Sequence, residues 1–122
     1  VQQALALARA TTVAYVSIGE LREGSLLRSQ GMISARELEE LRKLGAVGDT
    51  NGFFFDADGQ AVDHPLNRRT IALGFEELRK TQTVALVAGR SKLDAARGFL
   101  ASGAARGLII DGDTATELAA TM

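Results

Sequence analysis

A glycine and two basic side chains follow a predicted buried strand in the second half of the sequence. Residues 84–87 (VALV) are entirely apolar and precede Gly89, which lets backbone amides come close to an anion. Arg90 and Lys92 add a forked donor and a point charge where a predicted helix begins, and a helix start favours negative charge. The loop suits a phosphate, although it matches no complete phosphate-binding motif. An ordinary capped turn with two solvated cations fits the same spacing.

A second candidate site is the segment 48–52 (GDTNG), where Asp49 and two small polar side chains stand between glycines. A carboxylate in a partly dry pocket accepts hydrogen bonds from sugar hydroxyls, so Asp49 is a candidate for binding a sugar. The alternative is a turn in which Asp49 or Asn51 bonds its own backbone. The acidic run 56–59 (DADG) lacks the further ligands of a calcium loop and is interpreted as a hairpin turn.

Cysteine is absent and His64 is the single histidine, which restricts catalytic and metal chemistry. Disulfides, thiolate metal sites and cysteine nucleophiles are excluded, and a zinc site or a Ser-His-Asp triad would depend on His64 alone. No nucleophile is recognisable as its partner, so His64 is interpreted as a surface residue of a loop over 64–69. We expect no cofactor and no metal.

The charges nearly cancel, with 14 Lys and Arg residues against 15 Asp and Glu residues. A nucleic-acid-binding domain carries a clustered basic excess, so we expect no contact with DNA from this segment. The apolar runs are too short to span a membrane, and residues 1–9 have neither the basic leader nor the cleavage site of a signal peptide. The sequence is interpreted as a cytoplasmic protein, or part of one, with no membrane partner.

The elements that must position these residues alternate along the chain. Apolar runs predict buried strands over 13–18, 84–87 and 108–110. Helices are predicted over 35–44, opened by a capping box of Ser34 and Glu37, and over 91–102, opened by Ser91 and Asp94. Apolar strands alternating with helices are typical of a parallel sheet covered on both faces. The predicted fold is α/β, a three-layer Rossmann-like parallel sheet with a hairpin insertion over 48–73.

Four stretches of the chain resemble the effector domain of the SorC-type sugar-binding transcriptional regulators. They are IGELREGSLLRSQGMIS (18–34), GAVGDTNGFFFDADGQAVDHPLNRRTIAL (45–73), TVALVAGRSKLDAA (83–96) and GLIIDGDTATELA (107–119). The run Gly-Asp-x-x-Gly-aromatic, followed by Pro-Leu-Asn-x-Arg, is the specific part. The resemblance implies a sensor of a phosphorylated sugar, on a fold similar to that of sugar-phosphate isomerases and deaminases but without their catalysis.

The resemblance also implies roles for single residues. Asp49 falls where the family places an acidic group facing the sugar, Lys92 on a lysine that contacts ligand oxygens or phosphate, and Gly89 on the turn glycine. Arg69 matches a recurrent arginine with no assigned role. Arg90 stands where many members have a second glycine, so that it either crowds the pocket or adds a cation.

On the same resemblance, residues 1–122 are the C-terminal part of the effector domain of a longer regulator. The partners are then a phosphorylated sugar and other copies of the chain, in a dimer or tetramer. Operator DNA is bound only through an N-terminal helix-turn-helix that is absent from this sequence.

Two alternatives remain open. One is an isomerase or deaminase-like enzyme with Asp49 as base and Lys92 as anchor, although no second acid is placed for proton transfer. The other is an oligomerisation module that uses Phe53–Phe55 or the helix over 35–44.

Overall fold

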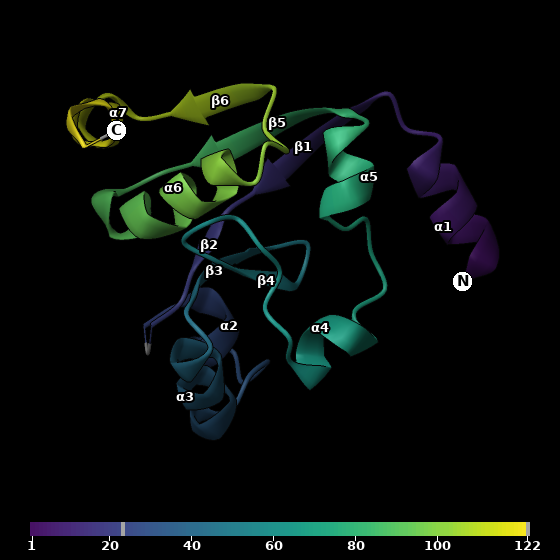
Figure 1. The fold of residues 1–122 in the computed structure, drawn as a ribbon, viewed down its shortest axis with the longest axis horizontal. Coiled ribbons are helices and arrows are strands. Elements are labelled where there is room, and N and C mark those ends of the chain that lie inside the picture. The colour runs from purple at the N-terminus through teal and green to yellow at the C-terminus, as the bar shows by residue number, and fades with distance from the viewer. Residues whose placement is uncertain (23, 122) are drawn as a thin grey trace.

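The computed structural model describes residues 1–22 and 24–121, which form two small sheets joined by short helices (Figure 1). The first sheet is parallel and has the strand order β1-β5-β6. Its strands are β1 (Val13–Ser17), β5 (Gln82–Val87) and β6 (Gly107–Ile110). The predicted α/β fold with a parallel sheet is confirmed, and all three strands predicted from the apolar runs are present.

The second sheet is antiparallel and consists, in order, of β2 (Gly19–Glu20), β3 (Ala46–Thr50) and β4 (Phe53–Asp56). Strands β3 and β4 form a hairpin whose turn residues, Asn51 and Gly52, have φ angles of 53° and 82°. Positive φ at both turn positions gives the twist that two-residue hairpins favour. The hairpin turn predicted over 56–59 is a different one and also forms: the Asp56 N–H donates to the Gln60 carbonyl at 2.9 Å, and Phe55 makes an isolated antiparallel bridge with Ala61. Only Ile18 separates β1 from β2, so the chain passes directly from one sheet into the other.

The helices are α1 (Gln2–Arg9), α2 (Leu26–Ser29), α3 (Ala35–Lys43), α4 (Pro65–Arg69), α5 (Phe75–Arg79), α6 (Leu93–Ala101) and α7 (Gly112–Ala120). The capping box predicted for α3 is confirmed: the Glu37 N–H donates to Ser34 Oγ at 3.0 Å, and the Ser34 N–H donates to Glu37 Oε1 at 2.9 Å. The capping box predicted for α6 is wrong, because a 3₁₀ turn (Arg90–Lys92) precedes α6 and Lys92 is its N-cap. None of the described helices has the length and apolar character needed to cross a membrane.

The prediction of a surface loop over 64–69 is also wrong. Pro65 begins helix α4, since its fixed φ suits a first helical position. His64 is only 5% exposed, and its Nδ1 accepts the Leu66 N–H at 3.1 Å as the N-cap of this helix. Its Nε2 lies 3.1 Å from Glu40 Oε1 on α3. His64 therefore joins two helices.

Two apolar cores lie on opposite sides of the hairpin. Phe55 is fully buried with Phe75 of α5 and Phe99 of α6, at ring-centroid distances of 5.6 and 6.0 Å. Its neighbour Phe54 packs in the other core, which includes Leu41 of α3. Consecutive strand residues point to opposite faces, so the aromatic run of β4 contributes to both cores.

One face of the parallel sheet is exposed in the described chain. Helices α5 and α6 pack with the face that carries Val16, Ala85 and Val87. On the other face, Leu86 pairs in register with Ile109 of β6, and Ile109 is 55% and Tyr15 67% exposed. Large apolar side chains on this face thus remain accessible.

Helix α6 packs against the antiparallel sheet with almost no space between their backbones. A Cβ at Gly98 of α6 would lie 2.6 Å from the Asp56 carbonyl oxygen, and one at Gly48 of β3 would lie 2.5 Å from the Ala95 Cβ. A Cβ at Gly59, in the turn after β4, would lie 2.2 Å from the Ser102 amide nitrogen. These positions accept only glycine without backbone displacement.

We expect Gly59→Ala to destabilise the protein far more than Gly45→Ala. Both glycines have positive φ, 80° and 87°, but a Cβ at Gly45 meets nothing within 4 Å. The backbone strain costs about 1 kcal/mol at each site, and the collision with α6 adds about 2 kcal/mol or more at Gly59. Urea denaturation of the purified protein measures the difference. Equal losses for the two variants would contradict the close packing of α6.

Candidate functional site

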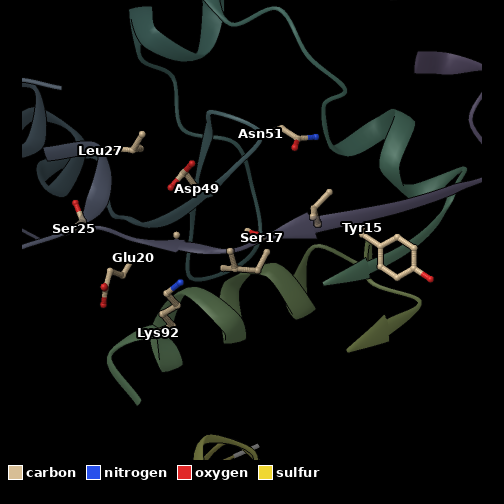
Figure 2. A pocket seen from close by; sticks show the side chains of 11 residues that line it. Tyr15, Ser17, Glu20, Ser25, Leu27, Asp49, Asn51 and Lys92 are labelled. Carbon is tan, nitrogen blue, oxygen red and sulfur yellow. The ribbon is translucent and has the colours of Figure 1, made fainter. Parts of the chain in front are cut away.

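A cleft of about 420 Å³ lies where the parallel sheet passes into the antiparallel one (Figure 2). Its lining includes Ser17 at the end of β1, Glu20 of β2, Asp49 of β3, Ser25 just before α2, and Lys92 just before α6. Ligands of open α/β sheets bind beyond the carboxyl ends of the strands, and this cleft lies beyond the carboxyl end of β1.

Asp49 is held against the backbone of the neighbouring strand. It pairs in register with Gly19 of β2, and a Cβ at Gly19 would lie 2.2 Å from Asp49 Oδ1. Because Gly19 has no side chain, the Asp49 carboxyl group fits against the backbone of β2. The structure puts Asp49 within a strand rather than in a turn, and the turn is formed by Asn51 and Gly52.

Burial raises the pKa of the Asp49 carboxyl from 3.8 to about 6. A hydrogen bond from the Gly52 amide and the positive charge of Lys92 act in the opposite direction and are outweighed. Removal from water disfavours the charged form of a carboxyl group, which is the cause of this shift. Asp49 therefore changes its protonation state close to neutral pH.

Lys92 contributes the positive charge of the cleft. It ends the 3₁₀ turn before α6, and in Figure 2 its side chain extends toward Asp49. A second hollow of about 410 Å³, beyond the carboxyl ends of β5 and β6, is also lined by Ser17 and Lys92. Within the described ranges, Lys92 has no carboxylate at ion-pair distance. The structure thus brings together the predicted pair Asp49 and Lys92, with the lysine between two hollows.

Glu20 is a cleft residue that sequence reasoning missed. Burial raises its pKa, but hydrogen bonds from Ser91 and Arg22 and the charges of Arg22 and Lys92 outweigh burial, so the pKa is lowered overall. Ser91, predicted as a helix cap, instead bonds this carboxylate. Glu20 and Gly19 follow a predicted strand directly, and the rule that ligands bind at strand ends could have found them.

Gly89 and Arg90 do not line the cleft of Asp49. Gly89 has a φ of 99°, and its N–H donates to Asp111 Oδ1 at 2.9 Å. This bond, with two further bonds from Thr114, lowers the pKa of Asp111 to about 2. Arg90 is paired with Glu117 of α7 at 3.0 Å. The backbone amide that sequence analysis assigned to a phosphate is therefore engaged within the protein.

Arg69 also lies outside the cleft. It is exposed at the end of α4, and its Nε donates to the Pro65 carbonyl at 3.4 Å. The residues that the structure describes contain no cluster of three His, Asp or Glu side chains able to hold a metal ion. The candidate site is therefore the cleft with Asp49, Lys92, Glu20 and Ser25.

Comparisons with known proteins agree with this architecture. Residues 1–120 match the family model described as "Putative sugar-binding domain". The erythritol catabolism regulatory protein EryD of Brucella abortus is 44% identical over 103 residues, which are 84% of this chain and 33% of that protein. The deoxyribonucleoside regulator of Bacillus subtilis is 34% identical over 119 residues, which are 97% of this chain and 38% of that protein.

A solved structure of a DeoR family transcriptional regulator from Listeria monocytogenes is 30% identical, with a TM-score of 0.92. The match covers 96% of this chain and 48% of that one, and the chain spans about a third of the two curated relatives. The resemblance stated from the sequence is confirmed. The chain belongs to the family of sugar-binding domains found in SorC- and DeoR-type transcriptional regulators.

Proposed function

We propose that this chain is the C-terminal part of a sugar-phosphate-binding effector domain, and that Asp49 and Lys92 bind the ligand. The observation that carries this proposal is that the two residues, far apart in the sequence, line one cleft beyond the end of β1. The Asp49 carboxylate accepts hydrogen bonds from sugar hydroxyls, and the Lys92 ammonium binds phosphate or hydroxyl oxygens. Gly89 and Arg90 support Lys92 by anchoring its turn to Asp111 and to α7.

On this proposal the ligand is a signal that controls transcription, and the protein does not convert it chemically. The relatives are regulators, which supports a sensing role. Ligand binding then changes the homo-oligomer, a dimer or tetramer, and its affinity for operator DNA through a separate helix-turn-helix domain in the cytoplasm. The exposed apolar face of the parallel sheet supports the view that further polypeptide packs there. Tyr15 and Ile109 are both more than half exposed on this face, and exposing apolar surface to water costs free energy.

The cleft favours binding over an isomerase or deaminase-like reaction. The raised pKa of Asp49 would suit a general base, but proton transfer needs a second group to act as acid. Glu20 is held ionised by Ser91 and Arg22, which lower its pKa. His64 is buried against Glu40 and does not line the cleft. For the oligomerisation alternative, Phe54 and Phe55 are buried within this chain and offer little surface to a partner.

We expect Asp49→Asn and Lys92→Gln each to weaken sugar-phosphate binding by about 10- to 100-fold, because each removes a charge-assisted hydrogen bond. Calorimetric titration of the intact regulator with ribose 5-phosphate, glucose 6-phosphate and erythritol 4-phosphate measures the affinity. The matched control is Lys43→Gln, at the end of α3 and outside the cleft. Failure of all three probes to bind the wild-type protein, or an equal loss for the control, would refute the proposal.

The affinity should fall as the pH is lowered through about 6, the raised pKa of Asp49. A sugar hydroxyl donates to the ionised carboxylate, so protonation of Asp49 in the free protein competes with binding. The phosphate has its own ionisation near this pH, and that ionisation also acts in Asp49→Asn. The ratio of wild-type to variant affinity therefore isolates Asp49. A ratio that stays constant between about pH 5 and 8 would show that protonation of Asp49 does not compete with ligand binding.

Operator binding gives a separate test of regulation. The sugar phosphate that binds the wild-type regulator should change the affinity of the regulator for operator DNA, as measured by an electrophoretic mobility-shift titration. Asp49→Asn and Lys92→Gln should bind the operator normally without ligand and lose most of the response at the same ligand concentration, since only the cleft is altered. A full response in both variants would place the effector site elsewhere.

A further inference from the structure

One hydroxyl group in the cleft is left without a partner. Ser25 is only 3% exposed, and its buried Oγ makes no hydrogen bond within the part of the chain that the structure describes. Its backbone is satisfied: the N–H donates to the Arg22 carbonyl at 3.0 Å, and the carbonyl accepts the Ser29 N–H at 2.8 Å. Buried polar side chains are rarely unpaired, because the lost hydration is costly. The hydroxyl is therefore fixed in place and free to bond a ligand.

The surroundings of Ser25 define what it can bind. Ser25 lines the cleft together with Glu20, Asp49 and Lys92, and Figure 2 shows these side chains toward one end of the cleft, with Tyr15 at the other. Glu20 is paired with Arg22, whose Nε lies 3.0 Å from Glu20 Oε2 and whose Nη2 donates to Glu20 Oε1 at 3.2 Å. A neutral hydroxyl can both donate to Asp49 and accept from Ser25.

We propose that Ser25 is a specificity-determining residue that hydrogen-bonds a hydroxyl of the ligand in the cleft beside Asp49. This inference rests on the proposed function, since it assigns one contact of a sugar phosphate in the same cleft. The presence and position of a ligand hydroxyl group beside Ser25 are then the features that Ser25 distinguishes.

The experiment compares Ser25→Ala with Ser29→Ala, an exposed position on α2 that does not line the cleft. Ser25→Ala should weaken binding of the tightest of ribose 5-phosphate, glucose 6-phosphate and erythritol 4-phosphate by about 3- to 10-fold, as expected for one neutral hydrogen bond. The melting temperature of the unliganded regulator should stay the same or rise, because the substitution removes an unpaired buried hydroxyl. Ser29→Ala should leave the affinity unchanged.

Two further measurements keep the test decisive. Ser25→Cys preserves the shape of the side chain, with a somewhat larger atom, but replaces the hydroxyl with a weak donor, so it should lose affinity as Ser25→Ala does. In the complete series of monodeoxy analogues of the tightest probe, one analogue should bind the wild type and Ser25→Ala equally.

The outcomes separate this inference from the proposed function. A lower melting temperature with unchanged affinity for Ser25→Ala would show a structural role and overturn the inference alone. An equal loss with every monodeoxy analogue would also overturn it. If the wild-type regulator binds none of the three sugar phosphates, the proposed function fails as well.

Discussion

The close packing of α6 against the β3–β4 hairpin is the constraint on which the site depends. Glycines at 48, 59 and 98 let the two backbones approach with no side chain between them. On the same face of the hairpin, Phe55 packs with Phe99 and links α6 to the core. This packing places the start of α6, and with it Lys92, beside the Asp49 strand. A helix displaced outward by one methyl group would separate the cation from the carboxyl group.

The two carboxyl groups of the cleft have opposite electrostatic roles. Asp49 is desolvated against Gly19, which raises its pKa, while Glu20 is bonded by Arg22 and Ser91, which lower its pKa. Glu20 is therefore an ionised carboxylate whose charge is offset by Arg22. Asp49 can accept a hydrogen bond when ionised and donate one when protonated, and it changes between these forms near neutral pH. Lys92 lies beside both carboxyl groups and supplies the positive charge that an anionic group of a ligand needs.

Much of the fold could be predicted because its signals are local. The apolar runs predicted the three strands of the parallel sheet, and the spacing of Ser34 and Glu37 predicted the start of α3. Errors arose where a distant partner decided the conformation. His64 is buried because Glu40 of α3 meets its ring, and Ser91 bonds Glu20 of β2 instead of capping α6. Neither partner is visible from the neighbouring residues.

The sequence by itself determined the α/β class, the hairpin, and Asp49 and Lys92 as candidate ligand residues, since strand alternation, turn glycines and residue chemistry act over a few positions. Only the tertiary structure decided which candidates share a cleft. Gly89 and Arg90 were candidates from spacing and Arg69 from the resemblance. In the structure Gly89 bonds Asp111, Arg90 pairs with Glu117, and Arg69 lies on α4 away from the cleft. Ser25 emerged only in three dimensions, because burial and the lack of a partner are properties of packing and not of residue type.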